Sequence, residues 1–317
     1  MKKYIKYVLH GVILIGVIVA AARYLNGEEV LNALTTFNYI YMPVMLLLAA
    51  SYISAKGWRF AWMMQPISKL PQDVFVRGYV AGTAATLVPA GVAARAGIMN
   101  QAGVSVAQSS APVAFSSIMD QAVFVAAALL SALFFPPVRG PALILLIVVI
   151  VIVLALAIPL TRSALAKAAG WVARKLKIQD HWQQFLNAVG DVLQPKIVAA
   201  AIIITIFGLA VQVMILDLTL RGFGQAVAYP TLFLAYTVPS MFGRLSGLPG
   251  GGVGVTEAGI VGFLSTSAQI DPEISLAAAA IFRVSTVLFQ ALLGAIIYFF
   301  FWKGEGEKRV RKETEQG

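Results

Sequence analysis

Each half of this chain carries a pair of charged residues inside a stretch that is otherwise apolar. Arg95 follows a short proline- and glycine-containing turn and precedes Asp120 by 25 positions. Glu257 follows a run of glycines and precedes Arg283 by 26 positions. Ionisable residues in apolar spans are costly and commonly bind a substrate, an ion or a proton. These four residues are therefore the first candidates for a binding site.

In each half, a segment that contains helix breakers comes directly before the first residue of the charged pair. The segment before Arg95 contains Pro89 and Gly91. The segment before Glu257 contains Pro249, Gly250, Gly251, Gly252 and Gly254. A helix that starts directly after such breakers exposes its first amide hydrogens and the positive end of its dipole, and glycines let a ligand approach the backbone. This arrangement suits an anion such as a lipid phosphate.

The charges support two interpretations. In the first, Arg95 and Arg283 neutralise a phosphate, while Asp120 and Glu257 hold these arginines or exchange protons. Arg244, just before the second glycine segment, is then either a further substrate contact or a side chain that extends to the outer interface. In the second interpretation, Asp120 pairs with Arg95 inside the protein. Glu257 pairs with Arg283 in the same way, and both ion pairs only fix helix packing.

The composition places these residues in a membrane protein. The 317 residues are 59% hydrophobic and 12% charged, which excludes a water-soluble domain of this size. The net charge of +10 comes from loops and tails that flank apolar stretches, so it indicates membrane orientation, and we expect no nucleic-acid partner. The chain has no cysteine and two isolated histidines. We therefore expect no disulfide, no metal site and no cofactor.

Six stretches are long and apolar enough to cross a hydrocarbon core of about 30 Å. They are 7–25, 40–64, 111–135, 141–160, 197–220 and 275–302. Two further apolar stretches, 73–103 and 227–267, are interrupted by proline and glycine. They are either re-entrant or broken helical hairpins or pairs of full crossings. The expected fold is an all-α integral membrane protein with about six full transmembrane helices and two such hairpins.

The positions of lysine and arginine predict the orientation. These residues gather at the N-terminus, around 69–77, within 162–196 and in the tail, so both termini are expected on the cytoplasmic side of the cell (inner) membrane. The hairpin 73–103 then starts and ends on the cytoplasmic side, and the hairpin 227–267 starts and ends on the opposite side. Opposite orientation of two similar segments indicates an inverted repeat, with a substrate site where the halves meet near the midplane.

This topology divides the chain, a single polytopic membrane domain, into four parts. They are a first half over 1–160, a cytoplasmic amphipathic linker over 161–196, a second half over 197–302 and a disordered cytoplasmic tail over 303–317. Lys56 and Arg59 lie near Trp58 and Trp62 in the first half. We interpret this group as an inner-leaflet belt, with a contact to anionic lipid as the alternative.

Two motifs carry a resemblance to a known family. The segment from Pro249 to Glu257, followed by Ala-Ala-Ala-Ala-Ile-Phe before Arg283, resembles the flippase-like membrane region of lysylphosphatidylglycerol synthases and related standalone membrane proteins. The segments 89–95 and 115–120 resemble the family's other motif, although the acidic–arginine pair usual ahead of Asp120 is missing here. The resemblance covers nearly the whole chain. It implies a membrane fold that moves lipids or lipid-linked sugars between leaflets.

The resemblance does not imply aminoacyl transfer, which those synthases carry in a separate soluble domain. Only the short charged tail follows the last apolar stretch, so we expect no enzyme activity. The expected function is secondary transport of an anionic phospholipid or a polyprenyl-phosphate-linked lipid, without ATP because the chain has no Gly-x-x-x-x-Gly-Lys-Ser/Thr loop. Two alternatives stay open. One is a small-solute or ion transporter of the same architecture, and the other is a noncatalytic scaffold that recruits a lipid-modifying enzyme as its partner.

Overall fold

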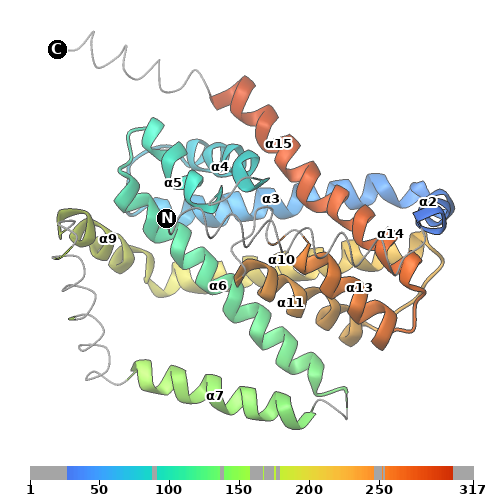
Figure 1. Cartoon of the computed structure of the whole chain (residues 1–317). Coiled ribbons are helices and arrows are strands. Elements are labelled where there is room, and N and C mark those ends of the chain that lie inside the picture. The colour runs from blue at the N-terminus through green and yellow to red at the C-terminus, as the bar shows by residue number, and fades with distance from the viewer. Residues whose placement is uncertain are drawn as a thin grey trace.

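The computed structural model describes residues 27–87, 91–135, 139–157, 179–245 and 254–302, together with the single positions Lys167, Lys175 and Gly252. Every regular element in these residues is a helix (Figure 1). The elements up to the middle of the chain are α2 (Gly27–Thr36), η1 (Tyr39–Tyr41), α3 (Met42–Met64), α4 (Gln72–Ala81), η2 (Gly82–Leu87), α5 (Gly91–Gln101), α6 (Val106–Ala132) and α7 (Arg139–Ala157). The later elements are α9 (Gln179–Val192), α10 (Pro195–Gly222), α11 (Tyr229–Leu245), α13 (Val255–Ser267), α14 (Pro272–Arg283), η4 (Val284–Leu288), α15 (Phe289–Ile297) and η5 (Tyr298–Trp302).

Four helical segments are long and apolar enough to cross a membrane. They are Tyr39–Met64, Val106–Ala132, Pro195–Gly222 and Pro272–Trp302. These segments confirm four of the six predicted spans and show a multi-pass membrane protein. A fifth predicted span, 141–160, coincides with α7, whose apolar described part covers Ala142–Val151. The sixth, 7–25, lies outside the described residues, as does the tail 303–317.

The long helices begin where the sequence provides starting signals. Proline occupies one of the first two helical positions of α3, α10 and α14, where the missing amide hydrogen costs nothing. Ser105 caps α6, because its hydroxyl accepts a hydrogen bond of 3.2 Å from the amide of Gln108. These signals fix the ends of helices whose interiors are held mainly by packing.

The two segments with helix breakers form short helices. In the first half, α4 and α5 have 10 and 11 residues, so each extends about 15 Å at 1.5 Å per residue, half of the hydrocarbon thickness. In the second half, α11 and α13 have 17 and 13 residues, or about 20 to 25 Å each. None of the four helices is long enough to cross alone. Re-entry from opposite sides of the membrane stays a prediction.

Helix α3 passes between two apolar cores. It packs along α10 and α4. One core contains Tyr52 of α3 and residues of α10, α11 and α14. The other contains Phe60 of α3, residues of α4 and α5, and Trp302 at the end of η5. Lys56 and Arg59 lie on α3 between Tyr52 and Phe60, so the boundary between the two cores is charged.

The segment just before the first-half breakers, η2, contacts α15. Thr83 in η2 donates a hydrogen bond of 2.9 Å to the carbonyl oxygen of Gln290 in α15. Gly294, one turn further, leaves no room for a side chain, since a Cβ there would lie 2.5 Å from the amide nitrogen of Ala84. This close approach of backbones attaches the broken segment of the first half to the second half.

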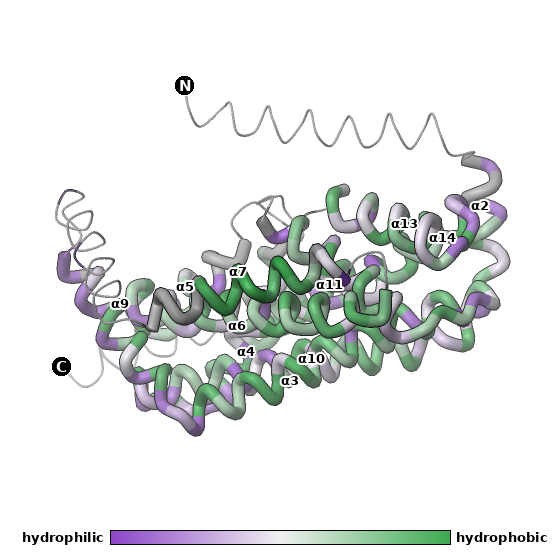
Figure 2. The backbone as a smooth tube through the Cα atoms, turned by 90° about the horizontal axis from the view of Figure 1, so that it is seen from below, coloured by the Kyte–Doolittle hydropathy of each residue, from purple (hydrophilic) through white to green (hydrophobic). Residues whose placement is uncertain are grey.

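The outer surface is apolar, as a bilayer requires. Helix α7 packs its first turns on the end of α6 and otherwise lies beside the bundle, and Figure 2 shows it as a strongly hydrophobic tube. Its exposed residues include Leu143, Ile144, Leu145, Ile147 and Val151. Ile203 and Phe207 of α10 and Phe300 of η5 are also exposed. Large apolar side chains therefore face outward, where lipid tails would contact them.

Candidate functional site

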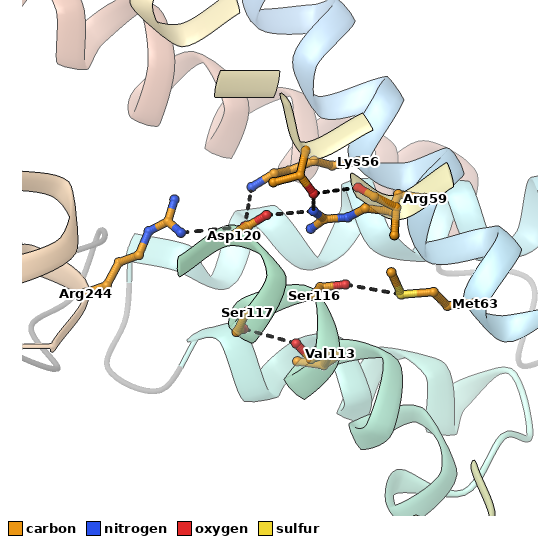
Figure 3. A network of polar contacts seen from close by, with 10 residues as sticks. Lys56, Arg59, Met63, Val113, Ser116, Ser117, Asp120 and Arg244 are labelled. Atoms are coloured by element: carbon orange, nitrogen blue, oxygen red, sulfur yellow. Dashed lines mark hydrogen bonds and ion pairs between the residues drawn. The ribbon is translucent and has the colours of Figure 1, made fainter. Parts of the chain in front are cut away.

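Asp120 of α6 forms ion pairs with three basic side chains from two other helices (Figure 3). Its Oδ2 atom lies 2.8 Å from Lys56 Nζ, and its Oδ1 atom lies 2.6 Å from Arg59 Nη1. Arg244 Nη1 of α11 lies further away, 3.6 Å from Oδ2. We call these four residues the Asp120 cluster. It contains three cations and one carboxylate, so it carries an excess of positive charge.

The α3 members of the cluster are buried because of their spacing. Residues three apart lie on one face of a helix, so Lys56 and Arg59 point together toward α6. Arg59 is 1% exposed and also donates a hydrogen bond to Thr205 of α10. Lys56 Nζ lies 4.7 Å from the centre of the Tyr52 ring. The interpretation of Lys56 and Arg59 as an inner-leaflet belt was wrong, because this face of α3 packs against α6 and α10.

Arg244 joins the second half of the chain to Asp120. It lies in the last turn of α11, and its guanidinium group stacks 4.5 Å from the centre of the Phe124 ring of α6. Its side chain remains 28% exposed. Arg244 therefore points toward the interior site, and the alternative in which it extends to the outer interface was wrong. Its substrate contact stays a prediction.

Glu257 and Arg283 form the predicted ion pair of the second half. Glu257 Oε1 contacts Arg283 Nε, and the two side chains are 21% and 16% exposed. The second carboxylate oxygen accepts a hydrogen bond of 2.6 Å from the amide of Gly254, so Glu257 also caps the start of α13. We call these two residues the Glu257 pair. It is neutral as a unit.

Arg95 and Asp120 do not form the ion pair that the second interpretation expected. Asp120 pairs with the three basic residues of its cluster, while Arg95 stacks 4.5 Å from the centre of the Tyr79 ring of α4. Its aliphatic part lies against Gly82, where a Cβ would come within 2.7 Å of Arg95 Cγ. The reason is geometric: Arg95 sits on α5 and packs on α4 and η2, whereas Lys56 and Arg59 are already in contact with the carboxylate.

The two glycines of the second segment that the structure describes have backbones that favour glycine. Gly252 and Gly254 have φ angles of +85° and +89°. A Cβ on Gly252 would lie 2.2 Å from the Cα atom of Gly243 in α11, so this segment passes directly over the helix that carries Arg244. Pro89, Pro249, Gly250 and Gly251 lie outside the described residues, and Gly91 is the first residue of α5.

Replacement of Gly252 by alanine should therefore destabilise the protein by about 2 to 4 kcal/mol, because backbone strain and a backbone clash add. Gly224 is a matched control, since its φ is +72° but a Cβ there would meet nothing within 4 Å. Gly224→Ala should cost only the strain, about 1 to 2 kcal/mol. Thermal unfolding in detergent measures both. Equal losses in the two variants would contradict the close packing of Gly252 on α11.

Comparison with known proteins places this architecture in a family. The family model described as the lysylphosphatidylglycerol synthase TM region matches residues 7–294. The chain belongs to this family. No curated protein matches the chain. The predicted resemblance is thus confirmed over nearly the whole membrane region, and the matched range includes the segments that hold both charged motifs.

Within this lysylphosphatidylglycerol synthase TM family member, sequence reasoning found Asp120 but missed its main partners. A signal existed: Lys56 and Arg59 are two cations on one helical face within an apolar span, and charges inside spans are functional candidates by default. Thr205 carries no such signal. No group of three potential metal-binding carboxylate, histidine or cysteine side chains occurs among the described residues.

Proposed function

We propose that this protein moves an anionic lipid between the leaflets of its membrane without consuming ATP, and that the Asp120 cluster binds the headgroup. One observation carries the proposal: three cationic side chains share a single carboxylate, and Lys56, Arg59 and Asp120 lie on helices long and apolar enough to span a membrane. Charges inside a bilayer are costly and commonly mark substrate pathways. A phosphate would balance the excess positive charge through charge-assisted hydrogen bonds.

The apolar exterior supports a lipid as the substrate. Acyl or prenyl chains can stay in the bilayer against exposed side chains such as Ile203 and Phe207, while only the headgroup enters the bundle. Arg244 could guide the headgroup into the bundle, since its side chain is partly exposed and yet contacts the buried carboxylate of Asp120. The family is named after an enzyme that makes a phospholipid, lysylphosphatidylglycerol. This name also supports a phospholipid as the substrate.

The broken helices supply the parts that would move. Arg244 lies in the last turn of α11 and Glu257 in the first turn of α13, so charged residues flank the second glycine segment on both sides. In the first half, Arg95 follows the other breakers and rests on the short helix α4. We infer that the two hairpins belong to an inverted repeat and open the headgroup site alternately to the two sides of the membrane.

Leaflet exchange of a fluorescent anionic phospholipid in proteoliposomes tests this proposal. Wild-type protein should accelerate exchange. Arg95 Nε is buried and has no hydrogen-bond partner among the described residues, so we propose that Arg95 also binds the headgroup. Arg95→Gln should then slow exchange about tenfold or more, because this charge-assisted contact is lost. Arg77→Gln is the matched control: Arg77 also lies in this hairpin, but its partner Asp73 is 64% exposed. This control should move lipid at the wild-type rate.

Three outcomes would count against lipid transport. Wild-type protein that accelerates no anionic lipid would contradict it directly. Uptake of a soluble anion without lipid exchange would favour the small-solute transporter instead. The scaffold would be favoured if a variant that no longer exchanges lipid still binds a lipid-modifying enzyme and leaves the cellular phenotype unchanged.

A further inference from the structure

The Asp120 cluster and the Glu257 pair differ in charge balance, and this difference bears on the substrate. Lys56, Arg59 and Arg244 face one carboxylate, so the cluster carries two more positive than negative charges. The Glu257 pair contains one charge of each sign and needs no further counterion. The two groups are therefore not equivalent anion sites. Of the two, the Asp120 cluster is the one with positive charge left for a ligand.

Two buried arginine nitrogens near this cluster also lack acceptors. Arg59 Nε and Arg95 Nε are both inaccessible to solvent and have no hydrogen-bond partner among the described residues. The side chain of Arg59 is only 2% exposed. Arginine stays charged in proteins and has donors only, so its natural partner is a group with acceptors only. Phosphate oxygens are such acceptors.

Arg95 faces the same region as the cluster. Its guanidinium group lies on the Tyr79 ring, and that ring packs 5.6 Å from the ring of Phe60, the neighbour of Arg59 on α3. Arg244 approaches the cluster from the other side, over the Phe124 ring of α6. A ligand between Arg95 and Arg244 would therefore contact cations from both halves of the chain.

We propose that the headgroup carried by this site is a phosphate monoester or diphosphate with two negative charges. The inference rests on the lipid transport proposed above and names the chemistry of its substrate. A phosphodiester headgroup has one negative charge and would leave one buried cation of the cluster unmatched. A zwitterionic or aminoacylated headgroup would bring additional positive charge to the same place. Unmatched buried charge is strongly unfavourable, so the site discriminates by headgroup charge.

Arg244 would set this preference. Its contact with Asp120 is the longest of the three, 3.6 Å, and its side chain is the most exposed. Of the three basic side chains, Arg244 therefore loses the least interaction energy when it turns from the carboxylate toward a phosphate. Without Arg244, the cluster would keep one excess positive charge, which a phosphodiester balances.

The test compares lipids in nanodiscs that contain the full chain. Phosphatidic acid supplies a phosphate monoester, phosphatidylglycerol a phosphodiester and phosphatidylcholine a zwitterion. At about pH 8 the doubly charged form is favoured, because the second pKa of phosphate monoesters on protein side chains is about 6 and nearby cations lower it further. Native mass spectrometry of retained lipid should show phosphatidic acid preferred over phosphatidylglycerol by about tenfold, as expected for one additional charge-assisted contact. Arg244→Gln should reduce this preference to near unity, and Arg77→Gln should keep it.

Further measurements distinguish a lipid headgroup from a soluble phosphate. They also distinguish failure of the doubly charged headgroup from failure of the proposed lipid transport. Inorganic phosphate and glycerol 3-phosphate should compete weakly; if either binds as tightly as phosphatidic acid, the ligand is a soluble phosphate and the lipid headgroup is overturned. Equal retention of both anionic lipids, in a protein that still exchanges lipid between leaflets, overturns the doubly charged headgroup alone. Absence of exchange for every lipid overturns the transport function itself.

Discussion

Asp120→Asn is expected to lower the free energy of unfolding by about 3 to 5 kcal/mol, because it leaves the buried Lys56 and Arg59 and the partly exposed Arg244 without their shared carboxylate. The amide can still accept a hydrogen bond, but it cannot offset the cost of keeping Lys56 and Arg59 charged inside the bundle. Thermal or denaturant unfolding in detergent should show the loss. Lipid exchange should fall with it.

A second substitution separates charge from shape. Lys56→Met combined with Asp120→Asn restores the net charge of the wild-type cluster, so the double variant should be more stable than Asp120→Asn alone. Asp73→Asn is the control for loss of an acidic residue. Asp73 pairs with Arg77 at the surface, 64% exposed, and its loss should cost at most about 1 kcal/mol. A double variant no more stable than Asp120→Asn would contradict the electrostatic explanation.

Glu257→Gln is expected to reduce lipid exchange by about tenfold or more while lowering stability by about 2 kcal/mol. Glutamine can still accept the hydrogen bond from the Gly254 amide, so the start of α13 is retained. The charge opposite Arg283 is lost, however, and the interior gains an unbalanced cation. Leaflet exchange and thermal unfolding, measured on the same preparation, separate the two effects.

The reciprocal variant sharpens this prediction. Arg283→Gln in the Glu257→Gln background makes the pair neutral again and should recover most of the stability. It should not recover exchange, because the charges themselves act in the proposed gating. Glu273→Gln, in the first turn of α14, controls for loss of an acidic residue near a helix start and should cost below about 1 kcal/mol. Recovery of exchange by the double variant would show that the pair serves packing alone.

The long helices were predictable because bilayer thickness imposes a length that hydropathy reveals directly. The predicted spans 40–64, 111–135, 197–220 and 275–302 agree with the observed helices to within a few residues. The Glu257 pair was predictable for a local reason. A capping glutamate at the start of α13 and an arginine at the end of α14 belong to adjacent helices that pack together, so few arrangements can satisfy both charges.

The partners of Asp120 were not predictable in the same way. Similar spacing in the two halves suggested that Asp120 would pair with Arg95, as Glu257 does with Arg283. Asp120 instead pairs with residues 61 and 64 positions earlier, and with Arg244 from the other half. A charge in an apolar helix can face the interior or the membrane surface. Only the rotation of α3 against α6 and α10 decides between these positions.

The sequence by itself thus determined that this is a multi-pass helical membrane protein, where four of its spans lie, and which charged residues stand at its two glycine-broken segments. Those features follow from the cost of polar groups in a bilayer, which acts on each segment separately. Tertiary structure alone decided how the charges combine. It placed three cations on Asp120 and left the Glu257 pair neutral, because ion pairing depends on which helix faces meet and not on distance along the chain.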